Sequence, residues 1–287
     1  VHKTVDFQMD YREPSDQEEL DNYISGFIKT FKLNQPPLFR AALVKDNDTY
    51  LFLFDMHHII SDGTSMVQFI NQLFDIYQGK EVPDLEIQYK DYAIWQNQQL
   101  ASEELKSQEE YWLEEFKEGS PVLNLPTDYQ RPPVFDTRGQ TYRFELDQQL
   151  TDKIHQFNIE QDTTLFMTLL AAYKILLAKY SHQEDIVVGT ATTGRNHPQL
   201  NDIIGMFVNT IPLRNQPEGE KRFVDYLTEV KEKALWAFEN QDFQFDSLVE
   251  RLGLRRNSDR NPLFDVVFVL QHADIEPTQI GNLQITP

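Results

Sequence analysis

The chain has 287 residues, of which 40% are hydrophobic and 12% aromatic, so it can fill a core of its own and is unlike a disordered chain. Its 46 Asp and Glu against 26 Lys and Arg give a formal charge of −20, which disfavours nucleic acid and anionic membranes as partners. Cysteine is absent, which excludes disulfides, thiolate metal sites and a cysteine nucleophile, and fits a cytoplasmic location.

A strand and a helix are predicted on either side of a histidine pair. Residues 49–55 contain a continuous apolar run typical of a strand that is covered on both faces. Residues 65–77 place apolar side chains three and four positions apart, as an amphipathic helix does. The pair His57 and His58 therefore lies on a turn from strand to helix. No run approaches the about 20 apolar residues that span a bilayer, so we expect a soluble protein.

The middle of the chain is expected to connect two lobes. Residues 103–116 have a helical pattern, and four prolines follow between positions 121 and 133. Prolines this dense continue neither a helix nor a central strand. We therefore predict an N-terminal lobe, residues 1–120, and a C-terminal lobe, residues 121–287.

The second half alternates irregularly between strands and helices. Residues 141–146, 185–189 and 264–270 have the composition or alternation of strands. Residues 163–180 predict a deeply buried helix and residues 223–238 a second helix. There is no repeat of fixed period. The fold class is therefore α/β, or α+β, with mixed sheets.

The pair His57 and His58 is followed by Asp62 and Gly63. This spacing is unusual enough to indicate a candidate catalytic site. A neutral imidazole can accept a proton from an incoming nucleophile near neutral pH. Asp62 could orient a histidine, as triad carboxylates do, or pair with an arginine and brace the turn. Gly63 suits a position with positive φ, or one where a substrate passes close to the backbone.

Two other interpretations of the histidine pair remain open on spacing alone. The histidines and Asp62 could be metal ligands, although no second cluster of ligands is visible in the sequence. Both histidines could also be structural residues that fill space and hold the backbone.

Five stretches resemble the signature segments of the condensation domains of nonribosomal peptide synthetases, a family similar in fold to chloramphenicol acetyltransferase. The stretch Met56–Ser65 reads MHHIISDGTS and resembles the HHxxxDG segment. Four more follow in the family's order: YKDYAIW at 89–95 resembles YxDYAVW, IGMFVNT at 204–210 resembles IGxFVNT, NQDFQFD at 240–246 resembles NQDYPFE, and RNSDRNPL at 256–263 resembles RDxSRNPL. The resemblance covers nearly the whole chain.

The resemblance implies a V-shaped, two-lobed fold with a tunnel, into which the phosphopantetheine arms of two carrier domains enter from opposite faces. It makes His58 the active-site imidazole, with His57, Asp62 and Gly63 in supporting positions. In the family the aspartate pairs with an arginine of an upstream segment that this sequence lacks. We therefore expect a loose turn, unless Arg40 replaces that arginine, and a chain that is incomplete at both ends.

Further residues are candidates for the tunnel wall. Ser65, at the end of the first segment, is one of them. Asn209 is another, although its amide could instead brace the backbone. The aromatic residues of 89–95 are expected to fill the core.

The reaction implied by the resemblance is attack by the α-amine of an acceptor aminoacyl thioester on the carbonyl of a donor thioester. Its partners would be the upstream and downstream peptidyl carrier domains and the adjacent adenylation domain. The substrates would ride on phosphopantetheine, with no intrinsic cofactor and no metal.

Related families offer alternatives. Epimerisation domains share the double histidine but usually lack the FVNT segment found here at 207–210, and cyclisation domains carry aspartates in place of the histidines. A non-catalytic module that docks carriers is the alternative from another class, but such relatives have typically lost the histidine that corresponds to His58.

Overall fold

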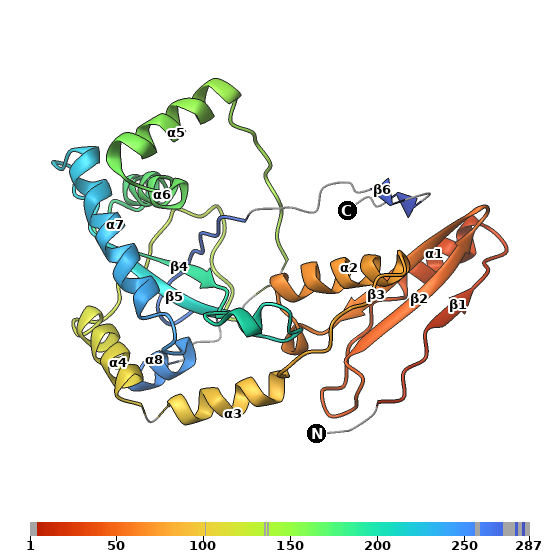
Figure 1. Cartoon of the computed structure of the whole chain (residues 1–287). Coiled ribbons are helices and arrows are strands. Elements are labelled where there is room, and N and C mark those ends of the chain that lie inside the picture. The colour runs from red at the N-terminus through yellow and green to blue at the C-terminus, as the bar shows by residue number, and fades with distance from the viewer. Residues whose placement is uncertain are drawn as a thin grey trace. The chain divides into compact units, whose positions relative to one another are not determined.

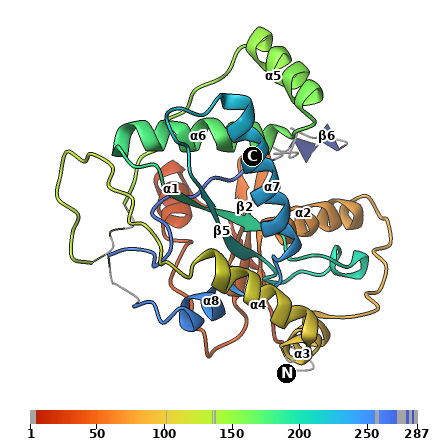
Figure 2. The same ribbon diagram turned by 90° about the vertical axis from the view of Figure 1, so that its left-hand side faces the viewer.

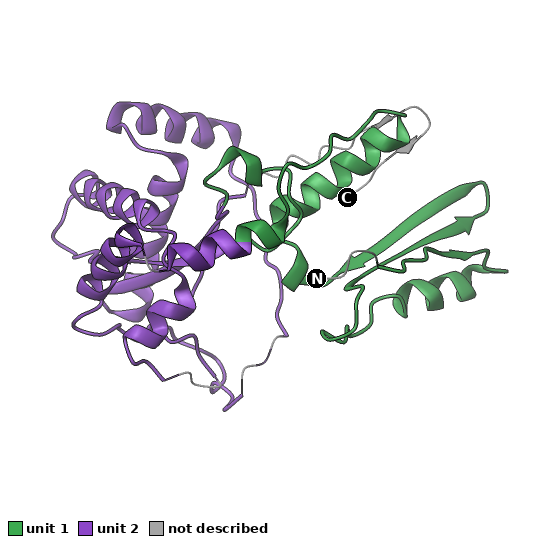
Figure 3. Ribbon diagram, turned by 60° about the horizontal axis from the view of Figure 1, so that its bottom comes forward, with its two compact units in different colours: residues 1–92, 195–207, 277–287 green, residues 93–194, 208–276 purple. Residues whose placement is uncertain are grey.

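The computed structural model describes residues 5–100, 102–134, 136, 138–255, 259–271, 279–280 and 283–284. The chain forms two compact units, shown in different colours in Figure 3. Unit 1 comprises residues 1–92, 195–207 and 277–287, and unit 2 comprises residues 93–194 and 208–276. The lobes 1–120 and 121–287 differ from these ranges and stay a prediction.

Unit 1 is built on a three-stranded sheet with the order β1-β2-β3 (Figure 1). Strand β1 (Asp10–Arg12) pairs with β2 (Phe39–Asp46) in parallel, and β2 pairs with β3 (Thr49–Met56) in antiparallel. The β2–β3 connection turns at Asn47, whose φ of 52° is one that asparagine tolerates better than most residues.

Two helices cover opposite faces of this sheet. Helix α1 (Gln17–Ser25) packs Leu20 against Ala42 and Val44 of β2. Helix α2 (Gly63–Tyr77) packs Phe69 against Phe39 and Phe54, which lie on the other face because successive side chains of a strand alternate.

The predicted strand at 49–55 is confirmed, but its burial on both faces is wrong. Phe54 lies beneath α2, whereas Tyr50 and Phe52 on the same face are 55% and 37% exposed. The helix covers only the end of β3 that leads into the histidine turn. The apolar run therefore reflects local aromatic packing rather than a strand in the interior of a sheet.

Unit 2 contains the antiparallel pair β4 (Ile186–Thr192) and β5 (Asn209–Asn215), buried along most of its length. Helices α6 (Leu165–Ser181) and α7 (Phe223–Glu239) contact this pair and each other (Figures 1 and 2). Both helices confirm predictions, but α6 is buried on one side only, since Leu176 and Tyr180 are 50% and 61% exposed.

Three more helices lie wholly within the described part of unit 2. Helix α4 (Glu103–Glu115), which the sequence predicts, contacts α8 (Phe245–Arg251), and α8 contacts β5. Helix α5 (Gln148–Gln161) contacts α6. The side chain of Trp112 on α4 is 1% exposed, and its indole N–H donates to the carbonyl of Asn240 at 2.8 Å. This bond anchors α4 in the core.

Two predicted strands of unit 2 are wrong. Residues 141–146 form no ladder with any described residue, and Tyr142 and Phe144 are 87% and 73% exposed. Alternation alone does not make a strand, because strands are stable only when paired. Residues 264–270 make a single parallel bridge, between Val267 and Gly189 of β4, rather than a full strand.

Helix α3 (Tyr89–Gln99) runs from residues of unit 1 into residues of unit 2. The 3-10 turns η1 (His58–Ile60) and η2 (Pro198–Leu200) and the short strands β6 (Gln279–Ile280) and β7 (Leu283–Gln284) complete the described elements. Within the described ranges, no helix has the length and apolar character needed to cross a membrane.

Candidate functional site

The histidine pair lies on the predicted turn between β3 and α2. The N–H of His57 donates to the carbonyl of Leu38 at 3.0 Å, which holds the end of β3. His58 opens the 3-10 turn η1, and α2 begins at Gly63. Asp62 is the N-cap of α2, and its carboxylate accepts from the N–H of Ser65 at 2.8 Å.

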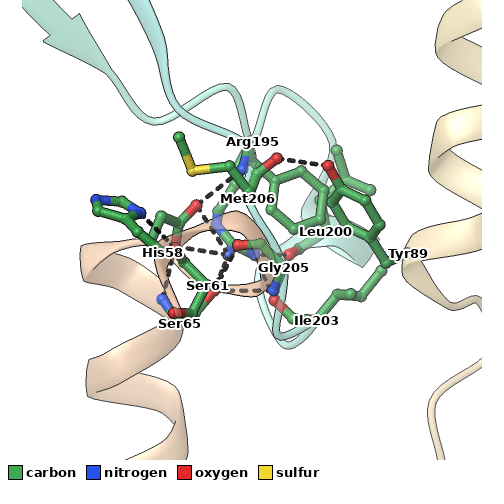
Figure 4. Close-up of polar contacts among 11 residues, drawn as sticks. His58, Ser61, Ser65, Tyr89, Arg195, Leu200, Ile203, Gly205 and Met206 are labelled. Carbon is green, nitrogen blue, oxygen red and sulfur yellow. Dashed lines mark hydrogen bonds and ion pairs between the residues drawn. The ribbon is translucent and has the colours of Figure 1, made fainter. Parts of the chain in front are cut away.

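The imidazole of His58 is exposed and is held by one hydrogen bond. Its Nδ1 lies 2.7 Å from the carbonyl oxygen of Ser61 (Figure 4). A carbonyl oxygen can only accept, so Nδ1 must carry the proton. In the neutral ring Nε2 then carries the lone pair, and it has no partner among the described residues. Nε2 of the neutral ring can therefore accept a proton.

The imidazole of His57 is half-buried and uses its nitrogens in the opposite way. Its Nδ1 accepts the N–H of Ile59 at 3.0 Å, so in the neutral ring the proton is on Nε2. The ring also packs against Phe31 in a T-shaped arrangement, with the ring centroids 5.9 Å apart. The two histidines thus lie in different environments, and His57 caps the turn that carries His58.

Asp62 is buried and pairs with an arginine that the sequence analysis missed. The side chains of Asp62 and Arg195 are 0% and 2% exposed, and the nearest nitrogen and oxygen are 3.1 Å apart. The carboxylate also accepts the N–H of Phe207 at 3.0 Å. Burial by itself would raise the pKa of Asp62, but hydrogen bonds from Ser65 and Phe207 and the charge of Arg195 hold it below its ordinary value.

The expectation of a loose turn without a partner for Asp62 is therefore wrong. Arg195 also donates to the carbonyls of Leu200 and Ile203, and its guanidinium carbon lies 4.1 Å from the ring centroid of Phe207. Arg40 is not the substitute, because its Nε pairs with Asp55 at 3.2 Å. No hydrogen bond among the described residues joins Asp62 to His58. The carboxylate braces the turn and does not orient the imidazole.

Ser65 belongs to the same buried network. Its side chain is fully buried, and its hydroxyl donates to the carbonyl of Gly205 at 2.8 Å. The same oxygen accepts the N–H of Gly205 at 3.0 Å and an N–H of Arg195 at 2.9 Å (Figure 4). A position for Ser65 on a tunnel wall stays a prediction. Its hydroxyl is already used to fasten the segment 204–207 to α2.

An aromatic cluster packs around that segment. The hydroxyl of Tyr89 donates to the carbonyl of Met206 at 2.7 Å (Figure 4). The ring of Tyr89 meets Phe207 edge-on. A Cβ at Gly205 would lie 2.1 Å from the ring of Tyr89, so only glycine fits there. Tyr92 is buried in the same cluster. These contacts support the expected core packing for Tyr89 and Tyr92, whereas Trp95 is 39% exposed.

Gly63 opens α2 beside the histidine turn and is exposed. Its φ is not positive, so that predicted reason for a glycine is wrong. A Cβ built at Gly63 would meet nothing within 4 Å. Space for a substrate close to the backbone stays the predicted reason for glycine here.

Asn209 belongs to unit 2, where its side chain is 5% exposed. Its Nδ2 donates to the carbonyls of Gln241 and Phe243 at 2.7 and 2.9 Å. Its Oδ1 accepts the N–H groups of Thr210 and Phe245 at 2.9 and 3.1 Å. All four contacts are to backbone, which favours the bracing alternative. A place on a tunnel wall stays a prediction.

The last predicted segment and the metal-site alternative add little to the candidate site. Residues 256–258 of the RNSDRNPL stretch lie outside the described residues, and Asn261 turns the chain by accepting the N–H of Leu263 at 3.0 Å. Among the described residues, no cluster of three or more His, Asp or Glu could hold a metal ion.

Comparison with known proteins adds sequence relatives. The family model described as a condensation domain matches residues 1–285. Gramicidin S synthase 2 of Aneurinibacillus migulanus is 47% identical over 288 residues, and bacitracin synthase 3 of Bacillus licheniformis is 46% identical over 288 residues. Both matches take in 100% of the chain but only 6% and 4% of those proteins, so the chain spans a small part of their length.

Two solved structures have the same fold. AB3403, a four-domain nonribosomal peptide synthetase in its holo form bound to AMP and glycine, matches 96% of this chain and 22% of its own, with a TM-score of 0.81 and 20% identity. The X-domain in complex with OxyB from teicoplanin biosynthesis matches 93% of this chain and 61% of its own, with a TM-score of 0.83 and 22% identity. The predicted mixed α/β fold is confirmed.

Proposed function

The chain belongs to the condensation-domain family, and from that premise we propose that it forms amide bonds within a nonribosomal peptide synthetase. The α-amine of an acceptor aminoacyl thioester attacks the carbonyl carbon of a donor peptidyl or aminoacyl thioester. A C–N bond forms, the C–S bond breaks, and the donor's thiol leaves. Both substrates arrive on the phosphopantetheine arms of carrier domains, so that much of the acceleration comes from their alignment.

The observation that carries this proposal is the state of His58. Its Nδ1–H is engaged by the carbonyl of Ser61, and Nε2 is left with a lone pair on an exposed ring. Nε2 would orient the attacking amine, accept its proton as the C–N bond forms, and return that proton to the departing sulfur. The proton then moves from nitrogen to sulfur without any further group.

The remaining site residues have supporting roles in this proposal. His57 and Asp62 hold the turn and the start of α2, at hydrogen-bond distance from backbone N–H groups. Gly63 leaves open space at the start of the helix. Ser65 fastens the segment around Gly205, and Asn209 braces a loop of unit 2.

The partners in this proposal are the upstream and downstream carrier domains and the adenylation domain of the same synthetase, in the cytoplasm. Gramicidin S synthase 2 and bacitracin synthase 3 are far longer than this chain, which supports a multidomain parent. The two-lobed arrangement with a through-tunnel is part of the same proposal.

The test is His58→Ala in the intact parent domain, supplied with a loaded donor carrier and a loaded acceptor carrier. We expect new amide to fall by at least about 100-fold, because general acid–base catalysis typically contributes that much. His155→Ala is the matched control, since His155 is an exposed histidine of α5, and it should leave the rate unchanged. Near-full product from His58→Ala would reject the central role.

The same incubation separates the alternatives. An epimerisation domain would yield racemised donor and no amide, and a docking module would bind the carriers and yield neither product. The FVNT segment at 207–210 and the intact His58 favour condensation over both.

A further inference from the structure

We propose that Arg40 and Phe31 are positioning residues for His58, which they hold in place through the neighbouring imidazole, His57. The importance of His58 for catalysis rests on the proposed function. The contacts that carry the inference stand by themselves, and all of them lie within unit 1.

Arg40 ties an irregular loop to the sheet. It lies on β2, and its Nε pairs with Asp55, its direct partner on β3, at 3.2 Å. Its Nη2 donates to the carbonyl of Lys29 at 2.5 Å and its Nη1 to the carbonyl of Phe27 at 3.4 Å. The side chains of Arg40 and Asp55 are 23% and 19% exposed, so this pair is better shielded from water than a surface pair.

Phe31 depends on that guanidinium for its place. Residues 28–38 contain no helix or strand, so regular hydrogen bonding does not fix the ring. The guanidinium carbon of Arg40 lies 3.8 Å from the ring centroid of Phe31, well within the range of a cation–π contact. Phe31 in turn meets His57 at an interplanar angle of 78°, an edge-to-face arrangement that favours one orientation of the imidazole.

His57 transmits this orientation to the turn that bears His58. Its Nδ1 must point at the N–H of Ile59, the residue that follows His58 in η1. A rotated His57 would leave that N–H without its acceptor and remove the side-chain contact that supports the turn, whose backbone bonds from Ile60 and Ser61 alone would then hold it. A shift of about 1 Å in a reacting group can cost up to about 100-fold in rate, so a loosened turn should lower the rate of the chemical step.

The first experiment reads the imidazoles directly, in the 287-residue chain labelled with ¹⁵N-histidine. In the wild type, long-range ¹H–¹⁵N spectra should show a proton on Nε2 of His57 and on Nδ1 of His58. In Phe31→Ala both rings should move toward the tautomer-averaged shifts of free histidine. Phe52→Ala is the matched control, because the ring of Phe52 stacks on Phe54, and no ring contact joins it to either histidine among the described residues.

A merely structural role predicts a different result. Phe31→Ala would then lower the melting temperature and leave both imidazole spectra of the folded protein unchanged, which would overturn the inference. Phe31→Leu keeps most of the apolar volume but loses the aromatic ring. If Phe31→Ala fails to fold, the imidazole spectra of Phe31→Leu provide the same test.

The second experiment uses Arg40→Lys in the intact parent domain. Lysine keeps the charge opposite Asp55 but loses the planar stacking surface and the fork of donors. We expect kcat to fall about tenfold while KM for the acceptor carrier stays within about twofold, because the loss is in alignment and not in carrier binding. Unchanged kcat would contradict the inference. If the wild type forms no amide, the proposed function fails, and the imidazole spectra still decide the inference.

Discussion

The two units differ in what lies at their centres. Unit 2 has one large apolar cluster, in which Trp112, Phe116 and Tyr226 are almost fully buried. Among its described residues, unit 1 has two small apolar clusters and, between α2 and the segment 195–207, the buried pair of Asp62 and Arg195. The unit that carries the histidine turn therefore depends on directional polar contacts. Such contacts fix a geometry, but they fail sharply when one partner is removed.

The largest expected effect is in unit 1. Asp62→Ala leaves Arg195 buried without a counter-charge and should cost about 3–5 kcal/mol of local stability. Hydrogen exchange at the amides of Ser65 and Phe207, both bound to Asp62, measures the loss. The control is Asp75→Ala, which removes the exposed pair with Lys80 and should cost less than about 1 kcal/mol. If these two amides exchange at the same rate in Asp62→Ala as in the wild type, unit 1 does not depend on the buried pair.

The stabilisation from the pair of Asp62 and Arg195 should depend on pH in the acid range. The folded-state pKa of Asp62 lies below its ordinary value of 3.8, so its contribution is complete above that pH. The contribution declines as the pH falls from 3.8 toward the lower, folded-state pKa, because the unfolded chain takes up the proton first, and it is lost below that pKa.

A polar brace in unit 2 makes the next test. Asn209→Ala removes four contacts to backbone and should cost roughly 2–4 kcal/mol, because buried groups lose their partners. Urea unfolding followed by tryptophan fluorescence reports it, since Trp112 and Trp236 lie in this unit. Asn124→Ala, at an exposed position, should change little. Equal effects of both variants would show that the apolar core alone sustains unit 2.

Two glycines of unit 1 give a matched pair of smaller effects. Gly205→Ala places a Cβ against the ring of Tyr89 and should cost about 1–3 kcal/mol. Gly63→Ala points into open space and should change stability by less than about 0.5 kcal/mol. If Gly63→Ala nonetheless slows amide formation, space for a substrate is the reason for the glycine. Thermal unfolding and the carrier assay separate the two effects.

A buried lysine of unit 2 gives a test that depends on pH. Burial lowers the pKa of Lys174 to about 7, and its ammonium faces the carbonyl of Leu213 and the amide oxygen of Asn215. The unfolded chain keeps this proton up to its ordinary pKa of 10.5, so stability should rise with pH between about 7 and 10. The slope should reach about 1 kcal/mol per pH unit, and Lys174→Met should remove it. Equal slopes in urea titrations would contradict this.

The local part of the candidate site could be predicted from the sequence. The strand, the turn and the helix around His57 and His58 follow from apolar spacing over about thirty residues. A cap such as Asp62 acts on amides within one helical turn. These features depend on neighbours in the chain.

The long-range part could not be predicted. Arg195 is 133 positions from Asp62, and no spacing within a single sequence links an aspartate to one arginine among many. The predicted burial of Tyr50 and Phe52 was wrong for the same reason. Whether these side chains are covered depends on how far α2 extends over the sheet. Residues 141–146 do alternate between apolar and polar side chains, as a strand would. A strand also needs a partner strand, which the described residues do not supply.

The distance between Asp62 and Arg195 along the chain has a consequence for synthesis. The ribosome adds roughly 5–20 residues per second, so Asp62 is made on the order of ten seconds before its cation exists. During that interval the carboxylate must stay hydrated, since burying it alone is costly. The turn that bears His58 therefore matures late, and a nascent chain that ends before residue 195 carries both histidines without their final support.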